Sequence, residues 1–128
     1  MTIEEEILQL KSISNIGLAL IDFTKSLYTG HFTRTQTDWV FKPNFVAFAI
    51  HSKKKNSITL SLRGSPPEFN GSHTSLLIYS GSGRSYSRCI IERPDQLDAA
   101  AYYIRRALAI YHLGRNRSRK ITPNKDQE

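Results

Sequence analysis

The stretch that decides the fold is NFVAFAIHSKKKNSITLSLRG, residues 44–64. Apolar side chains fill residues 45–50, and further on Ile58, Leu60 and Leu62 alternate with polar residues. A period of two is typical of β-strands, and here at least one face of each strand is apolar. The polar connection between the two segments has the length of a hairpin. The stretch therefore predicts two antiparallel strands with a cluster of lysines at the tip of their hairpin.

Helical patterns stand at both ends of the chain. Residues 2–28 begin with a capping-box pattern of Thr2 and Glu5, and their apolar residues recur at intervals of three and four. Gly17 leaves open whether this is one long helix or two consecutive ones. Residues 95–114 repeat the helical spacing, with Pro94 suited to the first turn and Gly114 suited to the C-terminal end.

Further strand patterns cover residues 29–42, 76–79 and about 86–92. Successive strands with short connections favour antiparallel pairing. We therefore expect an α+β fold, in which an antiparallel sheet of four or five strands carries an N-terminal and a C-terminal helix packed on one face. The domain should comprise residues 1–114, and residues 115–128 read as a basic, disordered tail.

The glycine-rich stretch YSGSGRSYSRC, residues 79–89, raises two alternatives. A phosphate-cradling loop needs a helix after its glycines, because the N-terminus of that helix holds the phosphate. The residues that follow Gly83 have strand character instead. The sequence therefore favours a turn between two strands, whose basic and hydroxyl side chains suit contacts to phosphate groups.

Positive charge is concentrated in the middle and the tail of the chain. The net charge is +7; residues 31–93 hold nine lysines and arginines against three acids, and residues 115–128 hold five against two. This asymmetry predicts an anionic partner, either nucleic acid or an acidic protein. The candidate contact residues are Lys53, Lys54, Lys55, Arg63, Arg84, Arg88, Arg115, Arg117, Arg119 and Lys120.

Catalytic and metal-binding patterns are missing from the sequence. The single cysteine, Cys89, lies in an apolar strand pattern, and the four histidines have no metal-ligand spacing. No acid–base pair or nucleophile motif is visible, so we expect no enzyme activity, no cofactor and no metal. The acidic N-terminus differs from a signal peptide, and no segment reaches the length of a membrane span. We therefore expect a soluble cytoplasmic protein that does not enter membranes.

The order of these segments resembles a known group. Residues 44–64, then GSGRSYSRCIIERPDQLDAAAYYIRRALAIY at 81–111, are similar to small bacterial domains of unknown function related to the MmcQ/YjbR-type proteins. The closing helix begins at a P-x-x-L-D pattern, here Pro94, Leu97 and Asp98. The resemblance spans roughly residues 35–112 and implies an α+β sheet, a double-wing DNA-binding role and an accessory function without catalytic motifs.

Two functions follow as hypotheses. The first is a non-enzymatic nucleic-acid-binding accessory module that contacts phosphates through two basic hairpin tips and the basic tail. The second is a protein-interaction or oligomerisation subunit of a larger bacterial complex. In that case an acidic partner meets the basic surface, or the apolar stripe of the N-terminal helix forms a homo-oligomer.

Overall fold

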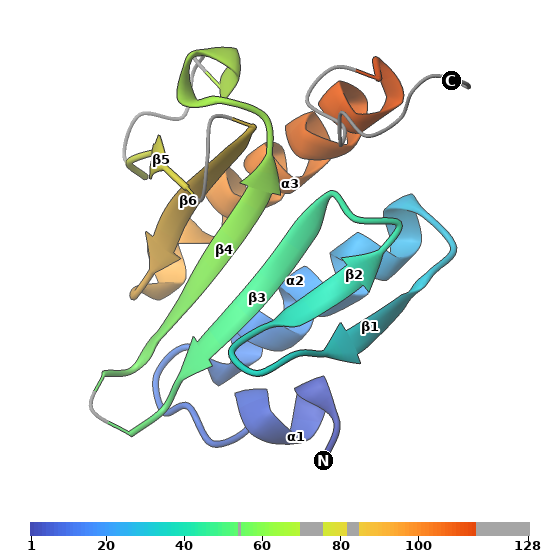
Figure 1. The fold of residues 1–128 in the computed structure, drawn as a ribbon. Helices are drawn as coiled ribbons and strands as arrows, with labels where there is room; N and C mark the ends of the chain where they lie inside the picture. Colours follow the sequence, from blue (N-terminus) through green and yellow to red (C-terminus); the bar gives the residue numbers. More distant parts are fainter. Residues whose placement is uncertain (54, 70–75, 82–84, 115–128) are drawn as a thin grey trace.

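The computed structural model describes residues 1–53, 55–69, 76–81 and 85–114. Its helices and strands follow one another as shown in Figure 1. The order is α1 (Ile3–Ile7), α2 (Ser14–Leu27), β1 (His31–Arg34), β2 (Trp39–Lys42), β3 (Val46–His51), β4 (Ser57–Arg63), β5 (Tyr79–Ser80), β6 (Tyr86–Ile91) and α3 (Leu97–His112), with short 3-10 turns at Pro66–Phe69 and Pro94–Gln96.

Within the described residues, the strands form one antiparallel sheet of six strands in the order β1-β2-β3-β4-β6-β5. The predicted central hairpin is confirmed, because β3 pairs with β4 from Val46↔Leu62 to His51↔Ser57. The expected count of four or five strands is too low. Residues 29–42 make two strands, joined at a turn in which the Thr35 amide donates to the Asp38 carbonyl.

The N-terminal region forms two consecutive helices and not one long helix, which was one of the two alternatives that the sequence left open. The capping box of Thr2 and Glu5 starts α1 as predicted. Gly17 explains why the second helix can lie so close to the first, since a Cβ there would come within 2.8 Å of the Ile7 side chain. The connection between the helices is fixed to the sheet, because the Lys11 amide donates to the Asn56 side chain at 2.8 Å.

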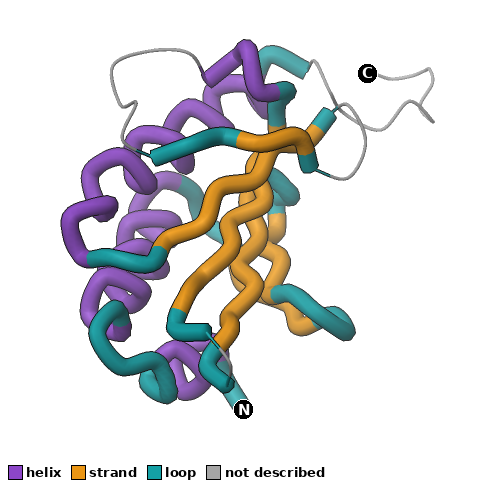
Figure 2. Tube along the Cα trace, turned by 90° about the vertical axis from the view of Figure 1, so that its left-hand side faces the viewer, coloured by secondary structure: helices purple, strands orange, loops and turns teal. Residues whose placement is uncertain are grey.

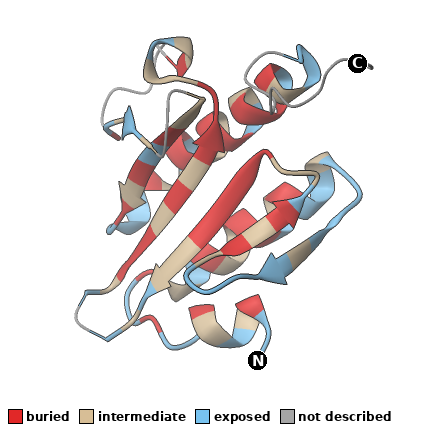
Figure 3. Ribbon diagram, in the orientation of Figure 1, coloured by how far each residue is buried: buried red, intermediate tan, exposed pale blue. Residues whose placement is uncertain are grey.

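The core lies between the sheet and the helices. Figure 2 shows α2 and α3 on the same side of the sheet, and α3 contacts β3, β4 and β6. The predicted α+β architecture is therefore confirmed. Side chains that point from the strands toward the helices are fully buried, as the red bands of Figure 3 show for the central strands. The largest of them are Phe41, Phe45, Phe48, Ile58, Leu60, Leu62 and Ile91.

The C-terminal helix starts slightly later than its sequence pattern indicates. Pro94–Gln96 form a 3-10 turn, and the buried Gln96 side chain accepts hydrogen bonds from the backbone amides of Glu92 and Arg93. Gly114 follows the helix with φ at +79°, which is the conformation of a C-terminal cap. Among the described residues, no helix is both long and apolar enough to cross a bilayer.

Gly64 and Gly114 both have positive φ, so replacing each of them with alanine gives two variants that can be compared. Gly64 has φ at +126°, and a Cβ there would lie 2.8 Å from Ile110, whereas a Cβ at Gly114 would meet nothing within 4 Å. We expect Gly64→Ala to lower the free energy of unfolding by about 2–4 kcal/mol through backbone strain and overpacking. Gly114→Ala should cost only about 1 kcal/mol, because it adds strain alone. Urea denaturation measures both; equal losses would contradict the packing of Gly64.

Candidate nucleic-acid interface

The two predicted basic tips lie at opposite ends of the sheet. The β3–β4 tip follows the pair His51↔Ser57, at the end where Ile58 pairs with Ile91. The turn before β6 lies at the other end, where Arg63 pairs with Tyr86 (Figure 1). β4 spans seven residues between these ends, which corresponds to about 20 Å at the usual rise of a strand. The two tips therefore do not stand side by side as a pair of wings.

The glycine-rich stretch connects two strands, as predicted. The Gly81 amide donates to the Tyr86 carbonyl at 2.9 Å, and β6 begins at that residue. No helix N-terminus follows the glycines, so a P-loop geometry is excluded. Arg84, at the centre of this turn, is outside the described residues.

Lys53 and Lys55 lie exposed at the tip between β3 and β4. Neither lysine forms an ion pair with a described residue. The strands below them are well fixed, since the ring of His51 shares a 3.2 Å hydrogen bond with Thr59. Lys54 is outside the described residues. The described part of the tip therefore presents two exposed ammonium groups on strands that are paired below them.

Toward the opposite end of the sheet, Arg88 lies exposed on β6, opposite Ser61 of β4 and beside its cross-strand partner Tyr79 on β5. Lys42, at the end of β2, is exposed too and pairs with His31. Both cations alternate with buried residues, so they lie on the face that the helices leave open. Sequence reasoning missed Lys42, because the hydrophobic alternation of WVFK gives its face but not its distance from Arg88.

Arg63 was predicted as a surface contact, and the structure places it in the interior. Only 6% of its surface is exposed. Its guanidinium lies 4.9 Å from the ring centre of Tyr86 and 5.8 Å from that of Tyr111, and Nη2 donates to the Asn44 carbonyl at 3.0 Å. A cation enclosed in this way holds β4, β6 and α3 together and does not face a ligand.

The remaining candidates are in the tail that follows residue 114. Tyr111, in the last turn of α3, touches the same guanidinium as Tyr86, so residue 114 ends the described chain close to the start of β6. The tail candidates are outside the described residues; they are Arg115, Arg117, Arg119 and Lys120.

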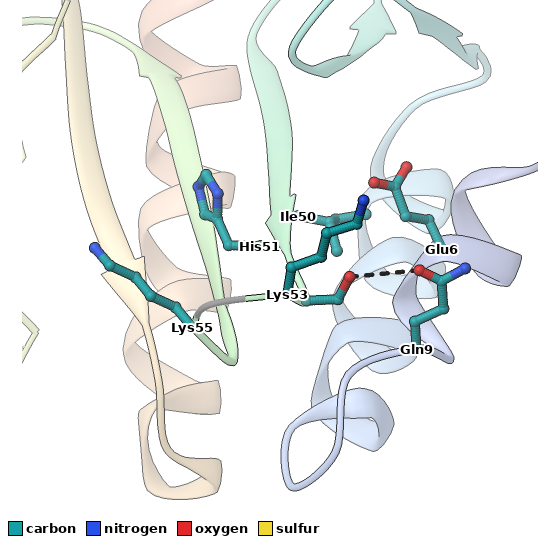
Figure 4. A pocket seen from close by; sticks show the side chains of 7 residues that line it. Glu6, Gln9, Ile50, His51, Lys53 and Lys55 are labelled. Atoms are coloured by element: carbon teal, nitrogen blue, oxygen red, sulfur yellow. Dashed lines mark hydrogen bonds between the residues drawn. The ribbon is translucent and has the colours of Figure 1, made fainter.

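A cavity of about 500 Å³ lies between α1 and the β3–β4 hairpin. Figure 4 shows Lys53 extending toward Glu6 on α1, while His51 and Lys55 lie on the other side of the hairpin. Two hydrogen bonds hold side chains that line the cavity in place. The Trp39 indole donates to Oε1 of Glu6 at 2.8 Å, and the Ser52 hydroxyl donates to Oε1 of Gln9 at 3.4 Å. Ile50 supplies an apolar wall, so the cavity combines both charges with neutral polar groups.

Reactive groups are scarce among the described residues. They contain no group of three or more histidine, cysteine, aspartate or glutamate side chains that could hold a metal ion. Cys89 is buried on β6, and burial raises the pKa of its thiol to about 12. A thiol of that pKa stays protonated at neutral pH and is a poor nucleophile.

Comparisons of the chain with protein-family models, with curated proteins and with solved structures find no match. The similarity to the MmcQ/YjbR-type domains therefore stays a prediction. The geometry of the described residues is what supports a function.

The buried thiol yields a prediction. Because its pKa is raised, Cys89 should react with a disulfide reagent at pH 7–8 at least 100-fold more slowly in the native protein than in denaturant. Cys89→Val should fold and lose at most about 1.5 kcal/mol, since the two side chains have similar volumes. Absorbance of the released reagent measures the rate. Fast labelling of the folded protein would place the thiol in an accessible, reactive site.

Proposed function

We propose that this protein is a non-enzymatic, cytoplasmic nucleic-acid-binding module that contacts phosphates with side chains at both ends of its sheet. The observation that carries the proposal is the exposed pair Lys53 and Lys55 on a fixed hairpin, without an acidic partner among the described residues. Ammonium groups presented in this way attract a polyanion by charge and by counterion release. The basic tail adds to the same attraction in this proposal.

The distribution of acids supports a local cationic surface despite the acidic first helix. Glu4 accepts a 3.0 Å hydrogen bond from Lys25, which lowers the pKa of the Glu4 carboxyl, and the two charges offset each other. Glu6 is engaged by the Trp39 indole. The charge of Glu4 is therefore offset by Lys25, whereas Glu6 keeps its negative charge on the side of the hairpin that faces α1.

An extended single strand fits the arrangement better than one groove of a duplex. Lys42 lies at the end of the sheet away from the hairpin lysines, about 20 Å along β4, and Arg88 lies between, opposite Ser61. Across the middle of the open face, the register aligns Val40, Ala47 and Ser61, with the cation Arg88 on β6 opposite Ser61. These three uncharged side chains leave room for a strand to lie along the sheet, with Arg88 beside it as a further cation.

A protein-binding role is the second candidate, and a specific observation favours it. Leu77 is 62% exposed and Tyr79 is 47% exposed beside the short edge strand β5. An apolar edge of this kind suits the addition of a strand from another protein. The N-terminal stripe, in contrast, is used within the chain, because Ile3, Ile7 and Leu20 are all buried. That burial leaves Leu8 and Tyr28 as exposed apolar residues of the N-terminal region, and oligomerisation through this region stays a prediction.

The salt dependence of binding tests the first candidate. We expect the double variant Lys53→Gln, Lys55→Gln to bind a fluorescent oligo-dC more weakly. The slope of log affinity against log salt should fall by about 1.4, which is about 0.7 for each lost contact to a single strand. Fluorescence anisotropy between 50 and 200 mM salt measures the slope.

The matched control removes the same charge from the helical layer. The double variant Lys25→Gln, Arg105→Gln changes two exposed cations away from the open face, and its slope should equal that of the wild-type protein. If both double variants lost the same slope, binding would depend on net charge and not on the hairpin. Absence of any binding at low salt would favour the protein-binding candidate.

The length of the oligonucleotide tests whether both ends of the sheet bind one strand. An oligo-dC of about 12 nucleotides spans about 20 Å even at the duplex spacing of roughly 3.4 Å per nucleotide, whereas a dinucleotide cannot reach that far even when fully extended. The longer strand should therefore gain at least tenfold in affinity from simultaneous contacts. Neutralising either Lys42 with Arg88, or Lys53 with Lys55, should remove that gain. A gain that survives both changes would show that the two ends do not share one strand.

A further inference from the structure

We infer that the cavity between α1 and the β3–β4 hairpin binds a single nucleotide whose base carries an exocyclic amino group. The inference rests on the proposed function and names the part of the strand that this end of the sheet recognises. The cavity measures about 500 Å³, inside the range of about 300–1,000 Å³ that small-molecule sites occupy. A nucleoside monophosphate fits within such a volume.

The lining requires a ligand with two chemically different parts. Lys53 attracts an anion, whereas the carboxylate of Glu6 repels one. A bare phosphate or sulfate would meet both effects at once. A nucleotide separates them, because its phosphate can face Lys53 while its base faces α1. Ile50 offers the apolar surface that the flat side of a base needs.

The hydrogen-bonding groups of Glu6 on α1 and of Gln9 just after it favour an amino-bearing base. Oε1 of Glu6 accepts from Trp39, so Oε2 remains to accept from an N–H group of the ligand. Oε1 of Gln9 accepts from Ser52, so the amide nitrogen of Gln9 remains to donate. A carboxylate that accepts from the amino group of cytosine is an established pairing. Cytosine offers an acceptor beside that amino group, whereas uracil offers an N–H in the acceptor's place and no amino group.

The two walls of the cavity are held at a fixed separation. The Lys11 amide donates to Oδ1 of Asn56 at 2.8 Å, which joins the connection after α1 to the base of the hairpin. The Trp39 indole fixes Glu6 from the neighbouring strand β2. A site whose groups are positioned before binding discriminates between ligands better than one that must form around them.

Titration with two nucleotides of equal size tests the inference. Cytidine and uridine 5′-monophosphate are added separately to the full-length ¹⁵N-labelled protein, and amide shifts of residues 6–9 and 50–55 are followed by NMR. We expect the cytidine nucleotide to bind about tenfold more tightly, the lower end of the discrimination that one such contact provides. Glu6→Gln should remove this preference while still allowing the Trp39 contact. Gln9→Ala should weaken binding, and Gln36→Ala, an exposed amide in the β1–β2 turn, should not.

Other outcomes would overturn the inference in distinguishable ways. Equal affinity for the two nucleotides would show that α1 does not read the base. Displacement of the cytidine nucleotide by an equal concentration of inorganic phosphate would show a simple anion site. If oligo-dC binds with the expected salt dependence but neither nucleotide shifts these residues, the inference fails and the proposed function stands. If oligo-dC does not bind either, both fail.

Discussion

The pairing of β4 on both of its sides determines the rest of the structure. β4 is bonded to β3 and to β6 along its length, and Ile58, Leu60 and Leu62 are fully buried against the helices. A shift of one residue in either pairing would turn these side chains to the open face. The same register sets which cations share an end of the sheet. The hydrophobic core and the candidate interface therefore depend on one alignment of strands.

Local patterns allowed much of this fold to be predicted. The apolar run of residues 45–50 and the alternation of residues 58–62 predicted the β3–β4 hairpin, and the spacing of the apolar residues with the Thr2 cap predicted the helices at the ends of the chain. The relation between distant segments was not predictable in the same way. The alternating pattern of β6 does not predict that β6 pairs with β4. It also does not predict that the turn before β6 lies at the end of the sheet away from the β3–β4 tip. For this reason two basic hairpins that looked like neighbours in the sequence are separated by the length of a strand.

In the candidate site, too, local patterns were predictable and contacts between distant segments were not. Lys53 and Lys55 were predicted, because a polar run between two strands is exposed. Glu6 and Gln9 were not, because α1 reaches the hairpin only when the chain turns back after Ile7. Arg63 was misplaced for a physical reason: charge alone predicts exposure, but two aromatic rings and a carbonyl oxygen stabilise its guanidinium inside the protein. Such compensation depends on partners that are distant in sequence.

The enclosure of Arg63 has a consequence for the order of folding. The β3–β4 hairpin closes a short loop, and hairpins of this kind form within about 1–10 μs. The rings around Arg63 come from β6 and from the last turn of α3, so this contact closes much longer loops. Until α3 docks, the guanidinium remains hydrated. We expect the contact to form after the folding barrier, so that loss of the Tyr111 ring would speed unfolding and leave the folding rate nearly unchanged.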